Sequence, residues 1–122
     1  MAETAARDAD CLFCKIIAGE IPSATVYQND QVYAFRDINP IAPTHVLIVP
    51  RAHIRDITAP EALDGATLSA LIAAANAIAR QEGVAESGFR LIWNVGPDAG
   101  QTVFHLHLHL LGGKPLGWSA GE

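Results

Sequence analysis

The sequence predicts an α+β fold, a mostly antiparallel five-stranded sheet with one long helix and a short N-terminal helix. Five segments of strand length follow one another, a long segment of helical periodicity lies between the third and fourth, and no repeat or linker divides the 122 residues. Half of the residues are apolar, enough for one core. We therefore expect residues 1–122 to form a single domain, with a flexible leader over 1–10 and an irregular tail over 112–122.

The first half of the chain predicts a short helical turn and three strands. KIIAGEIPS, directly after CLFC, is typical of a helical turn that Gly19 and Pro22 stop. Residues 24–28 and 31–37 resemble two strands joined by turn residues. Residues 45–50, HVLIVP, form a continuous apolar run that suits a strand buried on both faces.

The second half predicts the long helix and two more strands. Pro60 and Glu61 favour the start of a helix over about 61–81, and Gly83 lies just beyond its end. Apolar residues recur at helical spacing within it: Leu68, Leu71, Ile72, Ala75, Ile78 and Ala79. Residues 88–95 and 102–111 are then expected to be strands on either side of the loop GPDAGQ.

Composition excludes several classes of protein. No run of about 18 apolar residues could span a membrane. The polar, acidic start MAETAARDAD lacks the basic and apolar stretches of a secretory signal, so we expect a cytoplasmic protein. The net charge of −5 argues against a broad nucleic-acid-binding face. A small anionic ligand remains possible if local donors hold it.

The stretch HLHLH, residues 105–109, holds three of the five histidines. On a strand they share one face, and Phe104, Leu106, Leu108 and Leu110 cover the other. An amphipathic strand with a polar face is the alternative. Histidines two apart on a strand are ~6.6–6.8 Å apart and zinc–nitrogen bonds are ~2.0–2.1 Å, so one ion cannot take all three. His107, flanked on both sides, is the candidate nucleophile, and His109 the candidate proton carrier.

Cys11 and Cys14 form a C-x-x-C pair, which indicates either half of a zinc site or a redox pair. Together with His53 and His105 they would complete a Cys₂His₂ tetrahedral site. The redox interpretation is the weaker one, because the βαβ context of such motifs is missing. His53 could instead be a surface residue, and His45, at the start of a buried strand, a core histidine.

The loop GPDAGQT, residues 96–102, can turn backbone N–H groups toward an anion. A tight connection between two antiparallel strands is the alternative interpretation. Beside a histidine nucleophile, the same loop could hold the phosphate under attack.

HLHLHLL resembles the signature of the histidine triad family, His-φ-His-φ-His-φ-φ with φ apolar. The resemblance extends over CLFCKIIAGEIPSATVY, AFRDINPIAPTHVLIVPRAHI, NVGPDAGQTVFHLHLHLLGG and the closing tryptophan, and is nearest to the nucleotide-binding Hint branch. It implies a homodimer of antiparallel sheets with flanking helices that binds purine mononucleotides. It also implies hydrolysis of the P–N bond in adenosine 5′-phosphoramidates and aminoacyl-adenylate-like species, with no organic cofactor.

The resemblance also implies roles for individual residues. His107 corresponds to the nucleophile that forms a nucleotidyl-histidine, and His109 and His45 to its partners around the phosphate. Asp37 and Ile38 match the positions that hold ribose and base. The phosphate loop is matched by Asn94, Gly100, Gln101 and Thr102, the last of which stands where serine is common. Trp118 matches a tryptophan near the partner subunit's active site. Cys11, Cys14, His53 and His105 match a structural zinc site of bacterial relatives.

We expect a two-step displacement in which His107 attacks the α-phosphorus, Thr102 and loop N–H groups stabilise charge, and water then releases the nucleoside monophosphate. Two alternatives stay open. One is a dinucleoside polyphosphate hydrolase or nucleotidyltransferase of a sister branch, although His109 disfavours the transferases, which typically carry glutamine there. The other is a nucleotide-binding interaction module with incidental hydrolysis.

Overall fold

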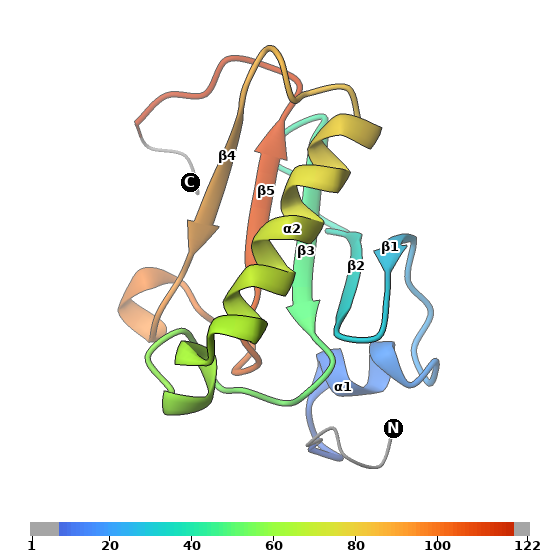
Figure 1. Cartoon of the computed structure of the whole chain (residues 1–122), viewed down its shortest axis with the longest axis vertical. Helices are drawn as coiled ribbons and strands as arrows, with labels where there is room; N and C mark the ends of the chain where they lie inside the picture. The colour runs from blue at the N-terminus through green and yellow to red at the C-terminus, as the bar shows by residue number, and fades with distance from the viewer. Residues whose placement is uncertain (1–7, 119–122) are drawn as a thin grey trace.

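The computed structural model describes residues 8–118, which form a five-stranded sheet and two α-helices (Figure 1). The elements are α1 (Leu12–Ile17), β1 (Thr25–Gln28), β2 (Val32–Arg36), β3 (Thr44–Pro50), α2 (Gly65–Gln81), β4 (Phe89–Trp93) and β5 (Leu108–Gly112). The strand order is β1-β2-β3-β5-β4, and all four neighbouring pairs are antiparallel. The predicted α+β fold with a five-stranded sheet is confirmed. None of the described helices is long and apolar enough to cross a membrane.

Helix α2 covers one face of the sheet and makes the main core. Its apolar stripe, with Leu71 and Ile78 fully buried, packs against alternate residues of the central strands. Those strand residues are Val32, Ala34, Val46, Ile48, Leu108 and Leu110. Because side chains alternate along a strand, the residues between them point to the opposite face, away from α2. The functional side chains come from that second face.

The short helix α1 lies near the end of β3 at which the chain leaves the sheet, and covers part of the second face (Figure 1). Phe13, Cys14 and Ile16 pack there with Tyr33, Phe35, Leu47 and Val49. The prediction placed the helical turn after the second cysteine, whereas α1 begins at Leu12 with Cys11 as its N-cap. The Cys11 sulfur accepts the N–H of Cys14, so the first turn of the helix includes the C-x-x-C pair.

The predicted helix over 61–81 is wrong in its first turn. Residues Pro60–Leu63 form a separate 3₁₀ helix, and α2 begins only at Gly65. Asp64 between them has an extended backbone, and its carboxylate accepts the N–H of Ala66. An aspartate that caps the next helix in this way interrupts the preceding turn.

The predicted last strand over 102–111 is also wrong at its start, because β5 begins at Leu108. Continued pairing would place Leu106 opposite Pro50, which has no N–H to donate. The Pro50 carbonyl instead meets His105 Nε2 at 2.8 Å, and the Leu106 N–H donates to the Ile54 carbonyl. Leu106 still joins the α2 core, but half-buried Phe104 packs under the Arg55 guanidinium. His105 and His107 therefore lie before the strand, and only His109 lies within it.

The ends of the chain differ in part from the prediction. Most of the expected leader, residues 1–7, and the last four residues lie outside the described range. Asp8 is placed, however: its carbonyl accepts the Cys11 N–H and its own N–H points at the Cys14 sulfur. Gly112 ends β5, and residues 113–118 are irregular as expected.

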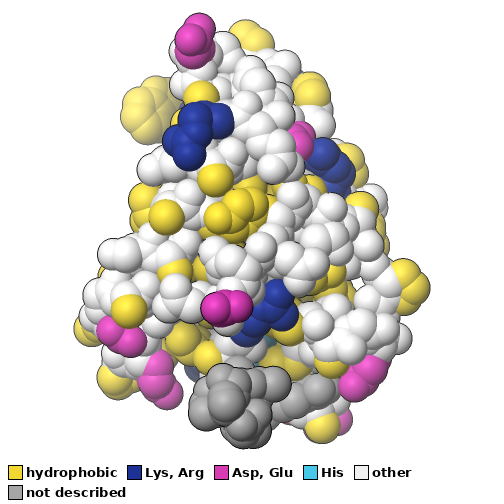
Figure 2. Space-filling model, turned by 45° about the vertical axis from the view of Figure 1, so that its right-hand side comes forward, with side chains coloured by type: hydrophobic (Ala, Val, Ile, Leu, Met, Phe, Trp, Pro, Cys, Tyr) yellow, Lys and Arg dark blue, Asp and Glu magenta, His cyan; other side chains and the backbone are white. Residues whose placement is uncertain are grey.

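The face in Figure 2 shows Lys and Arg side chains lying apart from one another, among single Asp and Glu.

The turn out of β5 generates a stability prediction. Gly113 has φ +92, and a Cβ there would lie 2.9 Å from Pro43 Cβ. Gly83, after α2, has φ +77 with nothing within 4 Å of such a Cβ. We expect Gly83→Ala to cost about 1–2 kcal/mol of unfolding free energy from the backbone alone. Gly113→Ala should cost more, and equal losses in urea denaturation would contradict this close approach.

Candidate functional site

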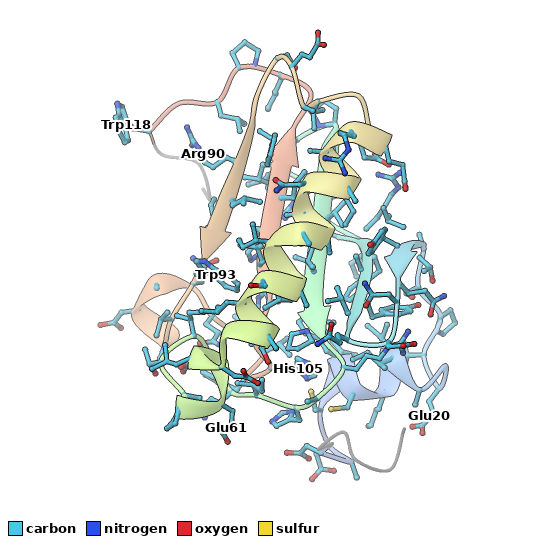
Figure 3. The ribbon with its side chains drawn as sticks, viewed as in Figure 1. Glu20, Glu61, Arg90, Trp93, His105 and Trp118 are labelled. Carbon is cyan, nitrogen blue, oxygen red and sulfur yellow. The ribbon has the colours of Figure 1, made fainter. Side chains whose placement is uncertain are left out.

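Four side chains predicted as metal ligands lie together at the start of α1. Cys11, Cys14, His53 and His105 present ligand atoms within 4.8 Å of one another. The His105 Nδ1 lies 3.4 Å from the Cys11 sulfur and 3.6 Å from the Cys14 sulfur, and His53 Nδ1 lies 3.5 Å from the latter. Figure 3 shows His105 beside these sulfur atoms. Neither thiol is in a disulfide.

These distances fit a tetrahedral ion. Zinc with bonds of ~2.3 Å to sulfur and ~2.0–2.1 Å to nitrogen separates the two kinds of ligand by about 3.6 Å. The nitrogen of His105 that faces the thiols is also the one free to bind. Its Nε2 donates to the Pro50 carbonyl, which leaves the Nδ1 lone pair toward the cluster. Burial lowers the pKa of His105 to about 4, so the ring is neutral. The donor set is compatible with zinc.

His107 has its tautomer set by the backbone two residues earlier. Its Nδ1 lies 2.7 Å from the His105 carbonyl oxygen, which can only accept, so Nδ1 carries the proton. The Nε2 atom then holds the lone pair. The ring is 9% exposed and burial lowers its pKa, which keeps it neutral. A neutral imidazole with one fixed N–H and one free lone pair is a ready nucleophile.

A chain of hydrogen bonds likewise sets the tautomers of His45 and His109. The Ile41 N–H donates to His45 Nδ1 at 3.2 Å, so the proton of neutral His45 is on Nε2. That Nε2–H lies 3.0 Å from His109 Nδ1 and 3.4 Å from the Asp37 Oδ2. His109 therefore accepts at Nδ1 and carries its own proton on Nε2. Burial, with His107 and His45 nearby, lowers the pKa of His109 to about 4.

The same chain argues against a second metal ion at these residues. Donor atoms of Asp37, His45 and His109 also lie within 4.8 Å of one another. A metal bound at His45 Nε2 would need the proton on Nδ1, where it would oppose the Ile41 N–H. Asp37 instead acts through its charge, which raises the pKa of His45, His107 and His109 against the larger lowering by burial. The trio is arranged to carry a proton.

Two pockets lie next to each other and share His109 in their walls. The first, of about 320 Å³, contains His107 and is walled largely by apolar side chains from α1, β2 and β3, including Phe13 and Phe35. The second, of about 330 Å³, contains His45 and is walled by Ile41, Ile92 and Leu111. Both are lined by Asp37, Asn39, Gly100 and His109. A molecule that spans the two pockets would contact the residues that they share, His109 among them.

The residues matched to ribose, base and phosphate lie in different parts of this region. Asp37 and Ile38 line the first pocket, and the Ile38 side chain is 91% exposed at its edge. Gly100 and Thr102 line the same pocket, and Asn94 lines the second. Gln101 lines neither, because its side chain is buried. Trp118 is fully exposed, and Figure 3 shows it pointing away from the fold.

Sequence reasoning missed two residues that shape the site. Phe13 lies edge-on to both His105 and His107, with ring centroids 5.9 and 5.1 Å away, and lines the first pocket. Its place within CLFC was the available signal, because residues between two ligands are fixed with them. Ile41 acts through its backbone N–H, and no residue pattern marks such a donor.

Fold and site together define a small α+β protein whose chemistry is carried by histidines. A sequence model of the HIT domain matches residues 18–116. The chain is 52% identical over 108 residues to the purine nucleoside phosphoramidase of Escherichia coli (strain K12), covering 88% of this chain and 91% of the relative. It is 44% identical over 116 residues to a 14 kDa zinc-binding protein of Zea mays, covering 93% and 90%. The structure of a HIT family hydrolase from Clostridium thermocellum matches with a TM-score of 0.87 at 49% identity, covering 91% and 96%.

The chain therefore belongs to the HIT domain family, and the resemblance stated from its sequence is confirmed.

The two tautomers can be tested without any ligand. In ¹⁵N NMR of the free protein at neutral pH, we expect His107 to carry its proton on Nδ1 and His45 to carry it on Nε2. Because the two rings are expected to be opposite tautomers, their ¹⁵N shifts in the same spectrum can be compared directly with each other. A His107 ring protonated on Nε2 would contradict the site as described.

Proposed function

We propose that this protein hydrolyses the P–N bond of adenosine 5′-phosphoramidates and aminoacyl-adenylate-like compounds to the nucleoside monophosphate, through a covalent nucleotidyl-histidine. One observation carries the proposal: neutral His107, with its lone pair on Nε2, lines a nucleotide-sized pocket together with His109, which carries an N–H on Nε2. The E. coli relative, named purine nucleoside phosphoramidase, supports the reaction class.

The first pocket suits a purine nucleoside. Its apolar wall, which includes Phe13, Phe35 and Leu47, can pack against a planar base. Ile38 at the edge can close over the base, and the Asp37 carboxylate can accept hydrogen bonds from ribose hydroxyls. The phosphate would then lie near Gly100 and Thr102 on one side and His107 and His109 on the other.

In the first step, His107 Nε2 attacks the α-phosphorus and the P–N bond to the amine breaks. The departing amine keeps the electron pair of the broken P–N bond and takes a proton from the His45–His109 pair, through His109 Nε2. On binding of the anionic substrate, the His45–His109 pair takes up one proton from solvent, because the phosphate and Asp37 charges nearby stabilise an imidazolium. The Thr102 hydroxyl stabilises charge on the phosphoryl oxygens.

In the second step, water attacks the phosphorus and the bond to His107 Nε2 breaks. The water proton returns to the His45–His109 pair, so the site regains its starting state. In-line displacement places the leaving group opposite His107. The second pocket, which is lined by Ile92, Leu111 and His45 and not by His107, would receive the amine.

We also propose that the Cys₂His₂ cluster holds a structural zinc ion and that the protein is a cytoplasmic homodimer with residues 1–122 as one domain. Cys11, Cys14, His53 and His105 would hold the ion, and the zinc-binding relative from Zea mays supports this. Bound zinc would supply a rigid crosslink between α1 and the segment before β5. For the dimer, the support is the exposed Trp118 and the half-buried edge strand β4.

The nucleophile assignment predicts that His107→Ala abolishes turnover. We expect kcat for an adenosine phosphoramidate to fall by about 10³-fold or more, because no other group can form the covalent intermediate. AMP binding, measured by calorimetry, should remain detectable and serves as the folding control. Wild-type rates in this variant would refute the assignment. Turnover of diadenosine polyphosphates by the wild type, faster than that of the phosphoramidate, would favour the sister-branch alternative.

The zinc assignment predicts one zinc per chain by elemental analysis of the purified protein. Chelation, or the change Cys14→Ser, should lower Tm by about 10 °C or more. A metal ion that binds the folded protein but not the unfolded chain adds its binding free energy to the stability of the fold, and removing the ion removes that contribution. Restored Tm on adding zinc to the chelated protein completes the experiment. Metal-free protein with an unchanged Tm would contradict a structural role.

A further inference from the structure

Gln101 differs from the other residues matched to the phosphate loop. Its side chain is 3% exposed and lines neither pocket, whereas Gly100 and Thr102 are exposed in the first pocket. Glutamine is mostly an exposed residue, and one buried to this degree needs partners for its whole amide group.

The buried amide of Gln101 has three partners, all of them backbone groups. Its Oε1 accepts the Gly96 N–H at 2.8 Å. Its Nε2 donates to the carbonyls of Arg55 at 3.0 Å and Val103 at 3.1 Å. Both amide hydrogens and the oxygen are therefore engaged, and the side chain has no N–H left to offer a phosphate.

These three contacts join the start of the loop, the residues just after it and the segment that follows β3. Gly96 opens the loop, and Val103 lies between the loop and His105. Arg55 belongs to the segment that follows β3, two residues beyond His53. The neighbouring Ile54 carbonyl accepts the Leu106 N–H, so this segment also ties to the histidine stretch. One amide thus fixes both ends of the loop to the part of the chain that carries the cluster.

The loop has little else to hold it. Its 3₁₀ helix, Pro97–Ala99, has three residues, and the N–H groups of Ala99 and Gly100 bond only within the loop. Asn94 adds one side-chain bond, to the Ala99 carbonyl. So short a helix does not form without outside contacts.

We propose that Gln101 is a positioning residue, which holds the loop 96–100 over the histidines from inside the protein without touching phosphate. The inference rests on the proposed function only in taking a nucleotide phosphate as the group that the loop meets. It replaces the expectation that Gln101 itself binds the nucleotide.

The first test is hydrogen exchange in the ligand-free protein. Gln101→Ala should speed exchange of the Ala99 and Gly100 amides by about tenfold or more, because the loop loses its anchors. Amides of α2 should exchange as before. Gln81→Ala is the matched control: its exposed Nε2 donates to one backbone carbonyl, that of Val26, far from the loop, and loop exchange should not change.

The second test separates positioning from contact by comparing AMP with adenosine. In Gln101→Ala, AMP affinity and kcat should each fall about tenfold, while adenosine affinity stays within about twofold. Gln101→Met, of similar length but without hydrogen bonds, should behave in the same way and supplies the result if the alanine variant does not fold.

Three outcomes would overturn the proposal. Weaker AMP binding with unchanged loop exchange would mean direct contact between Gln101 and phosphate. Faster exchange throughout α2, with loss of adenosine binding, would mean a general structural role. No change in either measurement would mean no role. A wild type without phosphoramidase activity would refute the proposed function alone, because the exchange test needs no substrate.

Discussion

The hydrogen bond from His107 Nδ1 to the His105 carbonyl joins the two chemical centres of this protein. On one side of it, the His105 ring faces two thiols; on the other, the His107 lone pair faces the first pocket. A carbonyl can only accept, so this contact decides which nitrogen of His107 can react. Its geometry in turn depends on where His105 is held, and that is settled by the cluster and the Pro50 carbonyl.

The early end of the sheet makes this contact possible. In a regular strand, His105 and His107 would point the same way at ~6.6–6.8 Å, and the backbone carbonyl between them would be used by the next strand. Because Pro50 cannot donate, pairing stops at Leu108, and the residues before it are free to turn. His105 then reaches the cluster, while His107 reaches the pocket and His109 stays on the sheet beside His45.

The fold was largely predictable because apolar periodicity decides which segments are strands and helices. The five strands and the long helix lie where alternation and helical spacing placed them. Their ends were not predictable, since the hydrogen bond of the Asp64 cap and the missing N–H of Pro50 are local features that periodicity does not register. In the site, residue type and spacing identified the histidines and cysteines. The burial of Gln101 and the donor at Ile41 depend on tertiary contacts between segments more than 40 residues apart or on backbone groups alone.

Helix α1 has only six residues, fewer than an isolated helix needs to persist in water. It nevertheless supplies Leu12, Phe13 and Ile16 to the wall of the first pocket, and its position depends on Cys11 and Cys14. The shape of the pocket thus depends on two thiols that do not line it. A chemical change at these two thiols would therefore move the α1 side of the pocket wall without any contact with a molecule bound in the pocket.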